Sequence, residues 1–222
     1  MNTFDTPAPI SAVLDIPAGR VQFIAADRTD TTVEVRPANP SNSRDTKAAE
    51  QTTVSFEDGV LRIEAEPAQN RVIGNSGSVE VTVQLPAGSR IDAKAASSEL
   101  RGVGRLGDVT FEGAHGTVKL DETAAARITL QAGDVTVGRL GGPAQISTQK
   151  GHIEIAEAVA GAFELRTEHG DITLTAAQGS SATLDAGTGY GRIDNALKNT
   201  ADTPDLTVQA TTSYGNITAR SL

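Results

Sequence analysis

A short unit, a glycine followed by a strand of alternating apolar residues, returns six times in the second half of this chain. In each unit one polar residue follows the glycine and an apolar residue comes next, and in every unit but 191–195 a second apolar residue follows two positions later. Successive glycines are 17 to 24 residues apart, and the units lie at 116–120, 133–137, 151–155, 170–174, 191–195 and 215–219. A repeat of this length predicts one structural unit that is used many times and stacks on its neighbours.

Composition narrows the fold further. Among 222 residues there are 22 glycines, aromatic residues make up only 3 %, and there is no Trp. The core must therefore consist of small aliphatic side chains, which suits thin stacked coils better than a bulky globular interior. We predict an all-β, single-chain β-solenoid, similar to a β-helix, with parallel coils of about 18–20 residues and an irregular β cap at the amino terminus.

Residues 89–222 are expected to form the regular solenoid, and residues 1–88 its opening coils and cap, in one continuous domain. The two parts share one strand-to-turn sequence, Ile16-Pro17-Ala18-Gly19 and Leu85-Pro86-Ala87-Gly88. Within the cap, a hairpin is expected around Asp58-Gly59. Stretches rich in Pro, Ser and Asn predict loops at 38–51 and 66–78.

Charge and cysteine content exclude several function classes. The formal net charge of −9 disfavours binding to nucleic acid, because phosphates repel an acidic surface. With no cysteine, disulfides and Cys-ligated zinc are excluded. The sequence shows no apolar run long enough for membrane insertion and no signal-peptide pattern in residues 1–10, so we expect a cytoplasmic protein, or alternatively one associated with the envelope through a partner.

One combination of motifs resembles a known family. Leu85-Pro86-Ala87-Gly88 is followed by Ser89-Arg90-Ile91-Asp92 and then by repeated Gly-Asp-Val/Ile-Thr-Val/Leu units. This arrangement is similar to that of the bacterial putative adhesin family, β-strand repeat proteins of unassigned function. The resemblance covers nearly the whole chain, and it implies a β-solenoid of a kind often found near the bacterial envelope.

The residue directly after each repeat glycine forms one outward column. In chain order it is Thr117, Asp134, His152, Asp171, Arg192 and Asn216. Asp134, His152 and Asp171 would then lie on three consecutive coils, close enough to share a divalent cation. In the alternative interpretation, these side chains bond to local backbone amides, as Asp and Asn often do in turns.

The residue before each glycine forms a second column, which contains the chain's only two tyrosines. In chain order it is His115, Ala132, Lys150, His169, Tyr190 and Tyr214. Tyr190 and Tyr214 with His169 beside them predict a platform for sugar rings or for a partner protein. The alternative is an aromatic ladder that only stiffens the last coils.

No catalytic residue or cofactor is predicted. The glycines near Gly187 lack the spacing of a nucleotide-binding loop, and no serine lies in a nucleophile elbow. We therefore expect a non-catalytic scaffold or binding module, adhesin-like, in envelope-associated assembly or signalling. The alternative is a carbohydrate-active enzyme, a glycosidase or lyase, with an acidic cleft on a solenoid face.

The end of the repeat bears on partners. The sequence stops at Arg220-Ser221-Leu222, directly after the last expected strand, which leaves the carboxy-terminal coil with an open edge. We expect a protein partner or self-association through that coil, or else a loop at 195–205 folded across it. A glycan is the other ligand expected.

Overall fold

The computed structural model describes residues 1–65 and 77–222 of the chain, so the loop expected at 66–78 falls mostly outside the described residues. Over the described ranges the chain forms seventeen strands and one short helix, which confirms the all-β prediction. The elements are β1 (Asn2–Asp5), β2 (Ser11–Ala26), β3 (Asp30–Pro37), α1 (Ser43–Gln51), β4 (Thr52–Glu57), β5 (Val60–Ala65), β6 (Val79–Pro86), β7 (Arg90–His115), β8 (Val118–Ala132), β9 (Val135–Leu140), β10 (Ala144–Lys150), β11 (Ile153–Ala158), β12 (Gly161–His169), β13 (Ile172–Ala176), β14 (Ala182–Tyr190), β15 (Ile193–Ala196), β16 (Leu206–Tyr214) and β17 (Ile217–Ser221).

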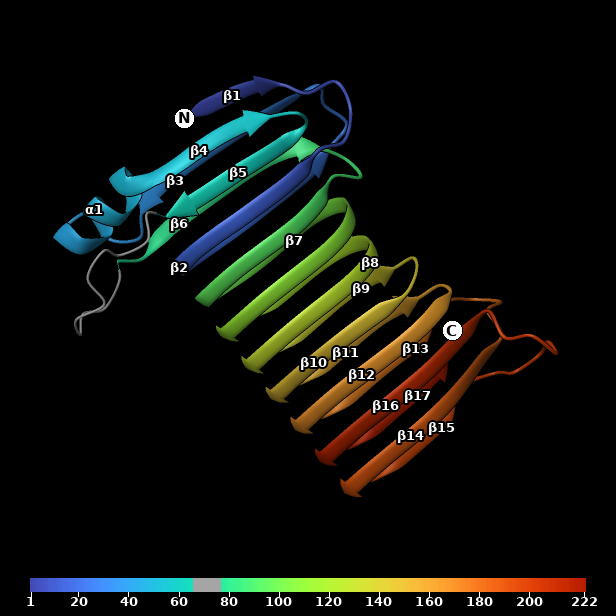
Figure 1. The fold of residues 1–222 in the computed structure, drawn as a ribbon. Helices are drawn as coiled ribbons and strands as arrows, with labels where there is room; N and C mark the ends of the chain where they lie inside the picture. The colour runs from blue at the N-terminus through green and yellow to red at the C-terminus, as the bar shows by residue number, and fades with distance from the viewer. Residues whose placement is uncertain (66–76) are drawn as a thin grey trace.

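The strands form one mostly parallel sheet that is not closed and that folds back on itself into two facing layers (Figure 1). From β8 onward, the paired strands of the first layer follow one another in the order β8, β10, β12, β16, β14. Those of the second layer follow in the order β8, β9, β11, β13, β17, β15. The long strands β2 and β8 pair with different neighbours along their length and so contribute to both layers. Each coil of the predicted solenoid is therefore one strand from each layer.

The core lies between the layers and is built from inward columns of aliphatic residues. In the second layer the column Val118, Val135, Ile153, Ile172 and Ile217 is at most 1 % exposed at every position. The alternate residues, such as Lys119 and Glu154, are exposed. This period-two alternation is what the sequence pattern predicts for strands with one buried face.

The repeat glycines are required because successive coils approach each other closely at the turn. A Cβ atom on Gly133 would lie 1.5 Å from the carbonyl oxygen of Gly116, and one on Gly151 would lie 2.0 Å from that of Gly133. Both glycines also have a φ near +150°, which other residues rarely adopt. The glycine therefore sets the spacing of the coils as well as the turn.

The order of the last coils in space differs from their order in the chain, which corrects the predicted stacking. Strand β16 pairs with β12 on one side and with β14 on the other, and β17 likewise lies between β13 and β15. The coil that comes last in the sequence is thus inserted one position back, and the coil of β14 and β15 ends the stack (Figure 1).

Two connections of unequal length produce this order. Residues 177–181 link β13 to β14 past the place that β16 and β17 later occupy, and residues 197–205 lead back. The return loop is held along the side of the stack, where Ser181 Oγ accepts the N–H groups of Thr200 and Ala201, and Ser221 Oγ accepts that of Lys198. The prediction that this loop folds across the end of the solenoid holds at one corner only, where the carbonyl of Lys198 accepts the N–H of Ala182 at the start of β14.

At the opposite end the stack is finished by antiparallel strands. Strand β4 pairs with β5, β3 with β6, and β1 with β3, all antiparallel. The hairpin between β4 and β5 turns at Asp58 and Gly59, both with positive φ. Phe4 of β1 and Phe56 of β4 meet with ring centroids 5.4 Å apart. This contact joins the two outermost strands across the end of the core.

The loop predicted at 38–51 was wrong in its second half, where helix α1 forms. Asn42 caps this helix and its side chain accepts the N–H of Arg44. Asp45 is only 7 % exposed and accepts the N–H groups of Asn39 and Ser78, which fixes the helix to the start of β6. The helix has nine residues, and no helix within residues 1–65 and 77–222 is long and apolar enough to cross a membrane.

Candidate functional site

Three exposed rings are in contact at the end of the first layer. His169, Tyr214 and Tyr190 are the last residues of β12, β16 and β14, in register with one another. The rings of His169 and Tyr214 are stacked, with centroids 5.1 Å apart and 13° between their planes. The rings of Tyr214 and Tyr190 are tilted by 40° with centroids 6.3 Å apart. We call these three residues the aromatic column.

The backbone explains why the rings align. Each residue of the column directly precedes a repeat glycine, and the N–H of Gly170 donates to the carbonyl of Tyr214 while that of Gly215 donates to the carbonyl of Tyr190. The predicted membership of the column holds, but its order does not. Tyr214 is the middle ring, because its coil is inserted between the other two.

The column is exposed to solvent. The exposed fraction is 76 % for Tyr190 and 58 % for Tyr214. Aromatic rings usually lose most of their surface in a folded chain, so rings that remain open are more typical of a contact surface than of a packed interior. Such rings present an apolar face together with a hydroxyl or imidazole edge that can form hydrogen bonds.

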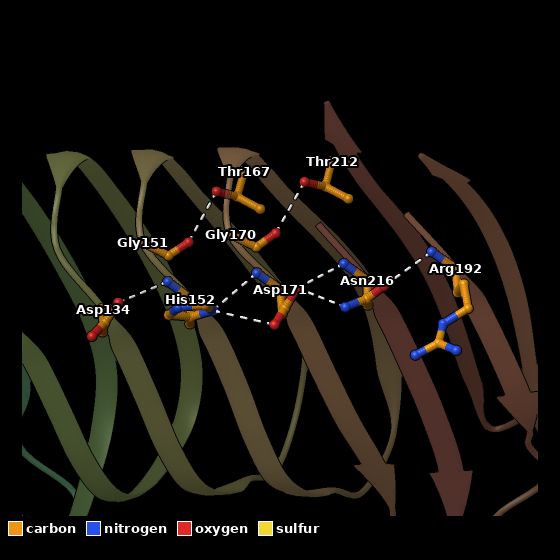
Figure 2. A network of polar contacts seen from close by, with 9 residues as sticks. All are labelled: Asp134, Gly151, His152, Thr167, Gly170, Asp171, Arg192, Thr212 and Asn216. Carbon is orange, nitrogen blue, oxygen red and sulfur yellow. Dashed lines mark hydrogen bonds and ion pairs between the residues drawn. The ribbon is translucent and has the colours of Figure 1, made fainter. Parts of the chain in front are cut away.

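The residues after the glycines form a hydrogen-bonded ladder between coils (Figure 2). Asp134 Oδ1 accepts the backbone N–H of His152 at 2.8 Å, and His152 Nδ1 accepts that of Asp171 at 3.0 Å. Asp171 Oδ1 accepts the N–H of Asn216 at 2.7 Å, and Asn216 Oδ1 accepts that of Arg192 at 3.0 Å. Each side chain thus caps an amide of the next coil in space.

This ladder replaces the shared metal site predicted for Asp134, His152 and Asp171. The oxygen and nitrogen atoms that could ligate a metal each accept a backbone N–H of the next coil, so they point along the stack instead of converging on one point (Figure 2). In the part of the chain that the structure describes, no group of three or more His, Asp or Glu side chains is placed to hold a metal ion. The alternative interpretation, in which these side chains bond to backbone amides, agrees with the geometry. The amides are not local, however, because each belongs to the next coil.

A second ladder lies under the turns and uses threonine. Thr167 Oγ1 donates to the carbonyl of Gly151, and Thr212 Oγ1 donates to that of Gly170, both at 3.0 Å (Figure 2). Thr167 and Thr212 are 1 % and 5 % exposed. Their hydroxyl groups are therefore satisfied inside the stack, which a buried polar group requires.

The open end of the stack is the coil of β14 and β15. Within residues 1–65 and 77–222, each of these strands has a paired neighbouring strand on one side only, β16 and β17 respectively. Ile193 of β15 is 45 % exposed, although its register partner Ile217 is 1 % exposed. The prediction placed the open edge on the carboxy-terminal coil, which was wrong because that coil is covered on both sides.

The sequence alone did not identify Ile193 as part of an exposed end. Its unit at 191–195 keeps the glycine and the first apolar position of the other units. Two signals were available, since Asn195 is polar where the other five units have an apolar residue, and the glycines of the last two units are 24 residues apart, the widest spacing of the series. That extra length is the return loop of residues 197–205.

Comparison with known proteins agrees with this architecture. The Toastrack DUF4097 family model matches residues 13–220. A crystal structure of a protein described as a putative adhesin, from Bacteroides fragilis, is 16 % identical with a TM-score of 0.59, over 98 % of this chain and 95 % of that one. A second, from Parabacteroides distasonis, is 14 % identical with a TM-score of 0.47, over 100 % of this chain and 95 % of that one.

No protein of curated function is significantly similar in sequence. The Bacteroides fragilis structure shares the fold at low identity, and the family match extends over nearly every described coil. The resemblance to β-strand repeat proteins of the adhesin type is therefore confirmed, and this chain belongs to the Toastrack DUF4097 family.

Proposed function

We propose that this protein is a non-catalytic, adhesin-like scaffold that binds a protein partner at the end of its solenoid, next to β14 and β15. One observation carries the proposal. Among the described residues, the large hydrophobic side chains that remain exposed are Met1, Leu222, Tyr190, Tyr214 and Ile193. The first two are terminal residues, and the other three lie in the last two coils of the stack.

The chemistry of this end favours a protein over other ligands. Tyrosine is enriched at the centres of protein interfaces, where a ring can be buried and its hydroxyl still bonded. The same coil offers the unpaired side of β14, to which an extended segment of a partner can add as a further strand. Gly187 and Gly189 have no side chains to hinder that approach.

A role in envelope-associated assembly is part of this proposal. It is supported by the description of the Bacteroides fragilis protein as a putative adhesin, a protein that shares the fold. The scaffold would hold one rigid binding end at a fixed distance from its cap.

Site-specific photo-crosslinking in cells of the source organism tests the proposal. A photoreactive phenylalanine analogue replaces Tyr190 in one version of the protein and Glu154, exposed on the second layer, in a control version. We expect one discrete adduct from position 190 and none from position 154. The substitution Tyr214→Ala in the crosslinking version should reduce that adduct at least tenfold, since interface tyrosines often contribute about 2 kcal/mol.

Thermal melting of Tyr214→Ala separates binding from stability. If its melting temperature falls and the adduct persists, the rings only stiffen the coils and the binding role is wrong. Equal adducts from positions 190 and 154 would also contradict the proposal, because they would show random collision.

A further inference from the structure

A trough runs across the outer surface of the first layer, parallel to the direction in which the coils stack. Its volume is about 970 Å³, and it crosses β7, β8, β10, β12, β16 and β14 near the start of each strand segment. The aromatic column lies at the other end of these strands. On β12, for example, Glu164 in the trough and His169 in the column are five residues apart, roughly 16 Å along a strand.

Side-chain length creates the trough. Three short residues, Ala125, Pro143 and Ala162, lie side by side on neighbouring strands and form the floor. Two positions further along the same strands, long polar residues stand in register and form a wall. They are Arg127, Gln145 and Glu164, and Gln209 continues the wall at the matching position of β16; all four are exposed.

The wall carries both hydrogen-bond donors and acceptors. Arg127 Nη1 donates to Gln145 Oε1 at 2.5 Å, and Gln145 Nε2 donates to Glu164 Oε2 at 3.2 Å. Near one end of the trough Arg90 pairs with Asp108 at 2.6 Å. Two further carboxylates line the trough, Asp92 near that end and Asp185 near the other, and they disfavour a polyanionic ligand.

The position of the trough also decides against a peptide strand as ligand. Each of β8, β10, β12 and β16 has a paired strand on both sides in this layer, so their backbone groups are already used. Recognition here must come from side chains, with one polar group per coil about every 4.8 Å. Amide and carboxylate groups above a floor of small apolar groups suit hydroxyl groups and the C–H faces of sugar rings.

We propose that this trough binds a linear, uncharged oligosaccharide that lies along the solenoid axis. This ligand site goes beyond the proposed protein-binding end and is distinct from it, because the trough includes neither the aromatic column nor Ile193. A chain that follows the trough contacts several coils at once, so its affinity increases with its length until it spans the crossed strands.

Calorimetric titration of the purified full chain tests the assignment. The probes are cellohexaose, maltohexaose and chitohexaose, with hexagalacturonate as the acidic comparison. We expect at least one neutral hexasaccharide to bind, its disaccharide to bind at least tenfold more weakly, and hexagalacturonate to bind more weakly than the neutral probe.

Two substitutions tie binding to the trough. Ala162→Arg places a long side chain on the floor and should weaken binding at least tenfold, whereas Ala156→Arg, at an exposed alanine of the second layer, should leave it unchanged. Gln145→Ala removes wall hydrogen bonds and should weaken binding about three- to tenfold. Melting of each variant shows that the fold is retained.

The assignment is overturned if none of the three neutral hexasaccharides binds at millimolar concentration, or if hexagalacturonate binds most tightly. It is also overturned if Ala162→Arg and Ala156→Arg bind the neutral probe equally well, since the ligand would then lie elsewhere.

Discussion

Ile193 and Ile217 are register partners on β15 and β17, yet Ile193 is 45 % exposed and Ile217 only 1 % exposed. Their burial reverses the expectation from chain order, in which the last unit would be the outermost. In space, the coil of Gly215 lies between those of Gly170 and Gly191. Two hydrogen bonds between coils show this order, since Thr212 donates to the carbonyl of Gly170 and Thr188 donates to that of Gly215.

This order predicts unequal costs for the same substitution at the two isoleucines. Ile217→Asp would place an unpaired carboxylate in the core and should lower the free energy of unfolding by at least ~3 kcal/mol. Ile193→Asp, at the open end, should lower it by about 1 kcal/mol. Urea unfolding of both variants measures the difference, and a larger loss for Ile193→Asp would contradict the inserted coil.

The strand pattern and the glycine turns were predictable because they depend on local chemistry. The alternation in units such as 133–137 assigns Val135 and Val137 to the core, and both are at most 1 % exposed. The coil order was hard to predict, because the units of Gly191 and Gly215 offer the same turn, the same threonine and the same inward isoleucine, and differ mainly at the next inward position, which is Asn195 in one and Ala219 in the other. Their places depend on the linkers 177–181 and 197–205 and on contacts that no local pattern specifies.

The same limit applies to the site. The column position of His169, Tyr190 and Tyr214 followed from their place before a glycine, but the contact of His169 with Tyr214 required the inserted coil. The ladder of Asp134, His152 and Asp171 involves side chains of the right kind for metal ligands. Only the direction of their hydrogen bonds shows that they cap amides.

Close approach of the coils predicts that Gly170→Ala is more costly than its backbone angle alone implies. The new Cβ would lie 2.0 Å from the carbonyl oxygen of Gly151, so the coils must separate. Gly179→Ala is the matched control, because Gly179 also has a positive φ but no atom of the described residues lies within 4 Å of its Cβ position. We expect the free energy of unfolding to fall by about 1–2 kcal/mol in the control and by at least ~3 kcal/mol in Gly170→Ala. Similar melting temperatures for the two variants would contradict the close approach.

The threonine ladder predicts a smaller loss of stability, confined to the threonines whose hydroxyl groups bond to the neighbouring coil. Thr212→Val keeps the shape of the side chain and removes the hydroxyl that donates to the carbonyl of Gly170. The free energy of unfolding should therefore fall by about 1 kcal/mol. Thr211→Val, at the next residue and exposed, should change the free energy of unfolding by less than about 0.5 kcal/mol. Denaturant unfolding compares the two, and an unchanged Thr212→Val midpoint would show that the hydroxyl contributes nothing.

In the cap, Arg28 controls the ionisation of Asp30. Hydrogen bonds from the Arg28 guanidinium, at 3.0 and 2.8 Å, lower the pKa of the Asp30 carboxyl below its ordinary value. A lowered pKa means that the folded chain favours the ionised form of Asp30. This pair therefore stabilises the fold at pH values above the pKa of Asp30 in the unfolded chain, and the stabilisation is lost as pH falls through the folded pKa.

Arg28→Met should therefore raise the pKa of Asp30 toward its ordinary value, measured by NMR titration of the carboxyl carbon. Arg36→Met, which removes the exposed partner of Glu34, should leave the pKa of Asp30 unchanged. Equal shifts in both variants would mean that general charge, and not the Arg28 hydrogen bonds, controls Asp30.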